Sequence, residues 1–374
     1  MGIIKNTMSG FGFDADAAIV SFPIELFMTE SDLSSINSAI SDFIFGLTAW
    51  KPSTSAVGVH KVAQIKFMGI NHEEALDQTH NHFMINNWGD GLPINPPTKK
   101  RVNDILQGTD LPRDHIIGKF MPRGGLVTVE TASVALAMAG GRPEYLPVLV
   151  AALEAVFDPI LKHASWQASS GSQFPVVIVN GPICRQIRLN SGFGLLGPDP
   201  QKPAGVAIGR AIRLLQQNVG GAIPGVGTMA IFGSMRTTNA VFAEDDENLP
   251  KDWKPLSSDR HGFSSACNAV TVVACSGGMN IMRRGSGKES AEQEVEQSLN
   301  RVARYLSQAA FHYLAGYEKG TPGILMLSSV LADRLSKFGI GQVQLKRELW
   351  RRSRIPQKDI EACGLSQWLE MDAS

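Results

Sequence analysis

The residues with the clearest capacity for chemistry lie in two neighbouring blocks of opposite charge. Residues 181–233 hold 11 of the 37 glycines and carry five cations against one acid. Backbone amides exposed at glycines, together with arginines, form a cradle for a carboxylate or phosphate. Residues 241–260 hold six acids and three bases. The two blocks together predict a site that combines an anion clamp with a general acid or base.

Residue type assigns candidate roles within these blocks. Proton transfer suits the carboxylates and a histidine that titrates near neutral pH, and these candidates are Glu244, Asp246, Glu247 and His261. Cys184 is a candidate nucleophile, because the adjacent Arg185 can lower the pKa of its thiol. The candidate substrate-binding residues are Asn180, Arg185, Asn190, Ser191 and Arg210. The alternative is ordinary ion pairing between loops, worth ~0–1 kcal/mol per exposed pair.

The arginines of one predicted helix, residues 206–219, have two interpretations. Arg210 and Arg213 lie opposite its apolar stripe, so we expect them to face water, a cleft or a partner. The alternative is a solvated helix face. Residues 192–197 spell G-x-G-x-x-G, but Pro198 blocks the helix that a dinucleotide site requires, which favours a tight glycine loop.

Metal binding has weaker support in the sequence. The carboxylates of residues 245–247 can bind a divalent cation through oxygen, although such a run is usually a charged surface loop. His72, His80 and His82 form a loose cluster, but His82 points away from the helix face that the other two share. We therefore predict no metal ligands and no required cofactor.

Composition limits the class of protein. The chain has 374 residues, 43% of them hydrophobic, and 35 basic residues balance 35 acidic ones. This excludes a disordered chain and a membrane bundle, and it argues against a nucleic-acid scaffold. No basic segment leads into an apolar one at the start, and four cysteines are scattered without a C-x-x-C pair. We expect a cytoplasmic homo-oligomer that binds a small-molecule substrate, without nucleic-acid or membrane partners.

Periodicity and turn residues predict long buried helices around a small sheet. The expected helices cover residues 30–45 (with Ser31 as cap), 72–86, 99–106, 128–139, 145–157, 206–219, 290–315 and 344–352. The expected buried strands cover residues 175–179, 269–275 and 324–327. This pattern gives a mixed α/β (α+β) fold. We expect a mainly helical N-terminal segment over residues 1–85 and a main domain over residues 86–374.

A series of motifs in the main domain gives a family resemblance. The motifs are WGDGLP (88–93), PPT (96–98), MAGGRPEYLP (138–147), VNGPI (179–183), NSGFG (190–194), IGRA (208–211) and NVGG (218–221). This order, over roughly residues 86–356, resembles a bacterial family whose members occur beside, or fused to, small (seleno)proteins with a UGSC motif. The resemblance implies a fold and a site location, and adds Trp88 and Asp90 to the candidate substrate-binding residues.

The chain departs from that family pattern at positions where the family has residues that could be catalytic. Gly141 stands where the family has a cysteine, Leu331 and Ser257 stand at histidine positions, and the acidic run reads EDDE. The sequence therefore leaves three functions open. The first is a cofactor-independent lyase or hydrolase acting on an anionic or polar substrate. The second is a thiol-, selenol- or metal-linked redox enzyme, and the third is a non-catalytic assembly protein with a decayed site.

Overall fold

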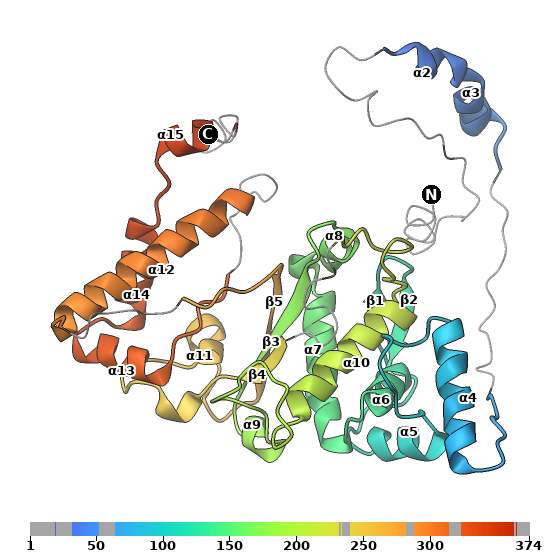
Figure 1. Cartoon of the computed structure of the whole chain (residues 1–374), viewed down its shortest axis with the longest axis horizontal. Helices are drawn as coiled ribbons and strands as arrows, with labels where there is room; N and C mark the ends of the chain where they lie inside the picture. The colour runs from blue at the N-terminus through green and yellow to red at the C-terminus, as the bar shows by residue number, and fades with distance from the viewer. Residues whose placement is uncertain are drawn as a thin grey trace.

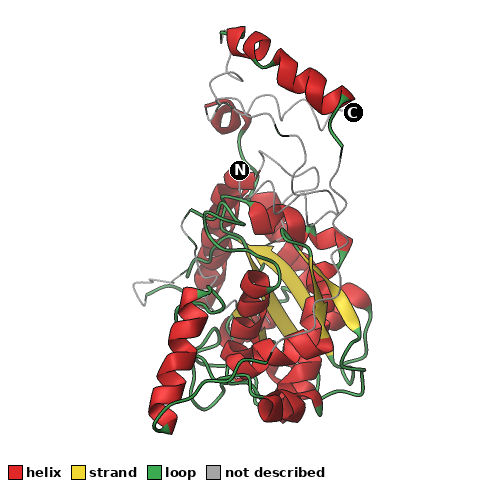
Figure 2. Cartoon of the chain, turned by 90° about the vertical axis from the view of Figure 1, so that its right-hand side faces the viewer, coloured by secondary structure: helices red, strands yellow, loops and turns green. Residues whose placement is uncertain are grey.

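A computed structural model describes residues 19, 32–51, 64–231, 233, 240–281, 288–313, 323–362 and 364. Within these residues the chain forms 14 α-helices and two small sheets of 2 and 3 strands, so the predicted mixed α/β fold is confirmed. The three-stranded sheet lies in the middle of the molecule, with helices around it (Figures 1 and 2).

The central sheet sets the direction of the chain at the site. It consists of β3 (Phe174–Asn180), β4 (Ala240–Ala243) and β5 (Ala269–Cys275), in the order β4-β3-β5. β4 runs parallel to β3, whereas β5 runs antiparallel to it. The carboxyl ends of β3 and β4 therefore meet the amino end of β5 at one edge of the sheet.

Both faces of β3 are covered, which explains its continuous apolar sequence. Val177 and Val179 belong to the main hydrophobic cluster on one face. Val176 and Ile178 belong to a smaller cluster on the other face, which includes Phe242 of β4. All seven residues of β3 are buried. A strand enclosed in this way holds the side chains at its end in fixed positions.

The main cluster is built by three buried helices: α6 (Val129–Met138), α7 (Leu146–Phe157) and α10 (Ala204–Asn218). α7 packs on β5 and α10 packs on β4. Thr128 caps α6 through a hydrogen bond from the backbone amide of Thr131, and a 3-10 turn over Pro143–Tyr145 leads into α7. These starts and stops agree with the sequence, because cap and proline preferences are local.

The remaining elements of this part surround the main cluster. They are α4 (His72–Ile85), α5 (Lys99–Leu106), the hairpin β1 (Ile116–Phe120) with β2 (Gly125–Thr128), α8 (His163–Ala168), α9 (Ile183–Gln186) and α11 (Leu256–His261). Nearer the N-terminus, α2 (Ser34–Ser38) and α3 (Ile40–Thr48) lie away from the sheet (Figure 1). Among the described residues, no helix combines the length and apolarity that crossing a bilayer requires.

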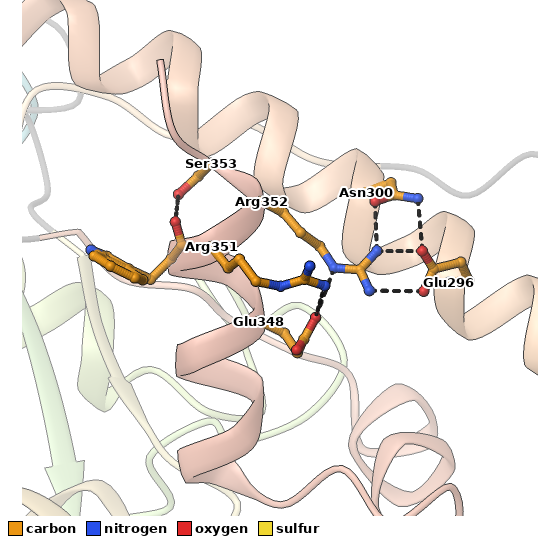
Figure 3. A network of polar contacts seen from close by, with 7 residues as sticks. Glu296, Asn300, Glu348, Arg351, Arg352 and Ser353 are labelled. Atoms are coloured by element: carbon orange, nitrogen blue, oxygen red, sulfur yellow. Dashed lines mark hydrogen bonds and ion pairs between the residues drawn. The ribbon is translucent and has the colours of Figure 1, made fainter. Parts of the chain in front are cut away.

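Three C-terminal helices form a hydrophobic cluster of their own: α12 (Ala291–Tyr313), α13 (Ser329–Lys337) and α14 (Gln342–Arg352). The short helix α15 (Gln357–Ala362) follows them and buries no residue. Val295 and Leu299 of α12 pack with Leu345 and Leu349 of α14. Beside this cluster Arg352 pairs with Glu296 of α12 and Glu348 of its own helix (Figure 3). This network fixes the register between the two helices.

Several predicted elements need correction. The helix expected at 30–45 is two helices, α2 and α3, and Ser31 lies outside the described residues. β5 is half-buried rather than buried. Residues 324–327 form no strand, because Ile324 packs against the sheet cluster and Leu327 against the C-terminal cluster instead of pairing in a ladder. Strand β4 was not predicted, because four residues are too few to show the hydrophobic pattern of a strand.

We predict that Gly205→Ala destabilises the fold by ~1–3 kcal/mol. A Cβ atom there would lie 2.3 Å from the carbonyl oxygen of Val241, so α10 would have to move off β4. Denaturant unfolding measures the change. Gly277→Ala is the matched control, since a Cβ at that position meets nothing within 4 Å. Equal stability of the two variants would show that the close approach of α10 to β4 does not contribute to the stability of the fold.

Candidate functional site

The candidate site lies at the edge where β3 and β4 end and β5 begins. Asn180 is the last residue of β3, Glu244 follows β4, and Asn268 precedes β5. The backbone amide of Glu244 donates to the carbonyl of Val179 (3.0 Å), which continues the strand pairing to the edge. In open α/β sheets this carboxyl edge is where ligands bind.

Two carboxylates share one buried amide at this edge. Asn180 Nδ2 donates to Glu244 Oε2 at 2.6 Å and to Asp246 Oδ1 at 2.8 Å. The second oxygen of Asp246 accepts from the backbone amide of Gly181 at 3.1 Å, and Glu244 also accepts from the amide of Leu256 at 2.7 Å. The structure thus brings together Asn180, Glu244 and Asp246 as predicted site residues.

The environment of Glu244 favours its protonated form. Burial is the largest cause and raises the pKa of Glu244, and the nearby charges of Asp246 and Asp259 raise it further. The hydrogen bonds from Leu256 and Asn180 oppose this shift without cancelling it. A carboxyl group with a raised pKa beside a second carboxylate is a common arrangement of a proton donor and acceptor pair.

Two buried polar atoms next to this pair lack a partner in the described part of the chain. Asn180 is 1% exposed, and its Oδ1 atom accepts no hydrogen bond. Ser257, also 1% exposed, follows Leu256 directly and has an unpaired hydroxyl. Buried polar atoms are usually satisfied by protein or by water. Hydrogen-bonding groups around Glu244 therefore outnumber the partners that the described residues offer them.

The turn after β3 brings a cation to the same edge. Gly181 has φ +96°, and a Cβ there would lie 2.3 Å from the carbonyl oxygen of Cys267, so only glycine fits. The amide of Ile183 donates to Asn268 Oδ1 at 2.8 Å. Asn268 was not among the residues predicted from the sequence. Arg185 then pairs with Glu247, and both side chains are more than half exposed.

The glycine loop that follows is held by Asn190 and is not a nucleotide-binding turn. The Asn190 amide donates to the carbonyls of Phe193 and Gly194, and its oxygen accepts from Lys202 Nζ at 3.0 Å. No helix follows this loop until α10. Asn190 therefore organises its own loop. Ser191 is half-buried and has no hydrogen bond to any other residue that the structure describes.

The structure corrects the prediction for Cys184. Its thiol is buried in the main cluster and donates to the carbonyl of Val179 at 3.4 Å. Burial, with a smaller effect of the Asp246 charge, raises the pKa of Cys184 to about 12. The neighbouring Arg185 pairs with Glu247 and does not lower the pKa of this thiol. A thiol in this state is a poor nucleophile.

The structure also corrects the prediction that Arg210 and Arg213 face water, a cleft or a partner. Arg210 forms a bidentate pair with Asp90, at 2.7 and 2.9 Å, and their side chains are 14% and 2% exposed. It also donates to the carbonyls of Leu92 and Pro93. Arg213 is 7% exposed and donates to the carbonyl of Ala222.

Asp90, Leu92 and Pro93, the partners of Arg210, belong to loop 88–93. This loop is also held at Trp88, whose carbonyl accepts from the Asn218 amide at 2.8 Å. Trp88 is partly exposed and makes edge-to-face contacts with the rings of His82 and Phe83. Several motif residues of the sequence therefore fasten loop 88–93 to α10, rather than binding a substrate at the β3–β4 edge.

The histidines are dispersed. His261 ends α11, is exposed, and lies against the ring of Phe263. His80 contacts the carbonyl of Ile94. In the part of the chain that the structure describes, no group of three or more His, Cys, Asp or Glu side chains is arranged to hold a metal ion.

Comparison with known proteins gave no match to a family model, a curated protein or a solved structure.

We predict that Asp90→Asn lowers the free energy of unfolding by ~3–5 kcal/mol at pH 7, because it leaves Arg210 buried without its counter-charge. Burial raises the pKa of Asp90, but Arg210 and the hydrogen bonds outweigh it, so the net shift is downward. The stabilisation is therefore full above the unfolded pKa and lost as pH falls through the lower folded value. The unfolded pKa of an aspartate is ~4. Denaturant unfolding between pH 2 and pH 7 should therefore show that the stability difference between wild type and variant shrinks as pH falls.

The matched control is Asp333→Asn, which breaks an exposed pair with Lys337. It should cost ~0–1 kcal/mol. If Asp90→Asn costs no more than this control, the pair between Asp90 and Arg210 does not hold the loop.

Proposed function

We propose that this protein is a cofactor-independent enzyme of lyase or hydrolase type that transfers protons to and from a small polar or anionic substrate at the β3–β4 edge. The observation that carries the proposal is the pair of carboxylates, Glu244 and Asp246, on the single buried amide of Asn180. Fixed geometry and unlike environments are what a general acid–base pair requires.

The two carboxyl groups have different proposed catalytic roles. Glu244 is the acid, since burial raises its pKa. Asp246 is the base, because hydrogen bonds from Asn180 and from the backbone amide of Gly181 hold both of its oxygens in fixed positions. The unpaired atoms of Asn180 and Ser257 support a polar group or water at this place.

Arg185 is the residue that would bind a negative charge on the substrate. Its pair with Glu247 is exposed, and such a pair contributes only ~0–1 kcal/mol. An anion can therefore replace Glu247 at small cost. Arg210 does not bind the substrate in this proposal, because its guanidinium group is already paired with Asp90. The raised pKa of Cys184 removes the support for the thiol alternative.

Glu244→Gln should reduce turnover by ~10²–10⁴-fold, because glutamine cannot donate the catalytic proton. Turnover is sought by mass spectrometry on a panel of hydroxy acids, amides and esters. The rate of the wild type should fall as pH rises through the raised pKa of Glu244, since only the protonated form acts as acid. The stability of the variant should be unchanged or higher at neutral pH, because ionisation of a carboxyl group with a raised pKa weakens the fold as pH rises.

Glu247→Gln is the matched control, since it removes a neighbouring carboxylate that is exposed and outside the shared amide contact. It should keep turnover within about tenfold of wild type, the scale of a weak surface pair. Full activity of Glu244→Gln, or equal losses in the two variants, would contradict the assignment of Glu244 as the acid.

A further inference from the structure

A hollow of about 340 Å³ lies apart from the β3–β4 edge and shares no residue with it. Three elements line this open hollow: the loop before α5, the outer side of α5, and the turn from α6 to the 3-10 helix. Its polar lining residues are Asn95, Arg101, Asp104 and Arg142, and its floor includes Ala137 and Gly141. Residues 140–143 of this hollow belong to the MAGGRPEYLP motif, which the proposed function does not use.

The polar side chains of this hollow form few hydrogen bonds or ion pairs with the residues that the structure describes. Asn95, Asp104 and Arg142 make no side-chain hydrogen bond or ion pair to another residue that the structure describes, and all three are exposed. Arg101 donates one N–H group to the carbonyl of Pro96 at 3.3 Å. Two guanidinium groups and one carboxylate therefore line one hollow without pairing with each other.

The backbone around the hollow is held in place. Thr98 caps α5 by accepting from the amide of Arg101, and Val102 and Ile105 bury the inner side of this helix. The amide of Asn95 donates to the carbonyl of Met138 at 3.1 Å, which fastens the loop to the end of α6. The fixed backbone keeps the lining residues near one another, so binding has to order only their side chains.

We propose that this hollow binds a small zwitterion of the α-amino-acid type. Arg142, with Arg101, would bind the carboxylate, and Asp104 would bind the ammonium group through charge-assisted hydrogen bonds. A simple anion would leave Asp104 unpaired beside it, and a simple cation would face two guanidinium groups. The volume lies at the lower end of the ~300–1,000 Å³ range of ligand pockets, so the ligand is small.

Isothermal titration calorimetry on the full chain tests this with L-alanine and two partial analogues. Propionate keeps the carboxylate and lacks the ammonium group, whereas L-alaninamide keeps the ammonium group and lacks the carboxylate. L-alanine should bind about tenfold or more tightly than either analogue, because each loses one charge-assisted contact.

Variants locate the site. Arg142→Gln and Asp104→Asn should each weaken L-alanine binding by about tenfold or more, and Asp104→Asn should leave propionate binding equal or stronger. Arg260→Gln and Asp114→Asn, at exposed positions outside the hollow, are matched controls that should leave binding unchanged. Glu244→Gln should also bind normally, which separates this site from the proposed active site.

Three results would overturn the proposal. They are the absence of saturable L-alanine binding, propionate binding as tight as that of L-alanine, and equal affinities of the hollow variants and the controls.

Discussion

The parallel pairing of β3 with β4 is the constraint on which the candidate site depends. It aligns Val179 with Ala243, so the next residues, Asn180 and Glu244, emerge at the same edge. The antiparallel β5 then delivers Asn268 to that edge from the opposite direction. Because the strands are covered on both faces, these positions cannot shift without disturbing two hydrophobic clusters.

This arrangement places a carboxyl group where the fold makes its charge costly. Burial opposes the ionisation of Glu244, and the two hydrogen bonds that it accepts offset only part of that penalty. The same burial acts on Cys184, where it raises the pKa to about 12 and makes the thiol a packing group. One physical effect therefore favours acid chemistry by Glu244 and disfavours nucleophilic chemistry by Cys184.

The arginines divide between structure and binding according to burial. Arg210 is enclosed with Asp90 and Arg213 is buried on the same helix, so both hold the polypeptide in place. Arg185 and Arg142 are exposed, and the first is held only by a surface pair. Exposed cations can change partners at small cost, whereas breaking a buried pair leaves an uncompensated charge.

The sequence by itself determined the elements whose signals are local. Helical periodicity predicted the helices at 99–106 and 128–139, the β-branched run before Asn180 predicted β3, and residue type alone selected Asn180, Glu244 and Asp246 as candidates. Caps, periodicity and turn residues act within a few positions of the chain, and such effects are readable without a fold.

Only the tertiary structure decided which of these residues meet. Asn180 and Glu244 are 64 positions apart, and Arg210 is 120 positions from Asp90. No local pattern specifies that β4, a strand of four residues, pairs parallel to β3, or that the polar side of α10 is covered by loop 88–93. Partner choice over such separations depends on how strands and helices pack, and burial, which sets the pKa of Glu244 and Cys184, exists only once they have packed.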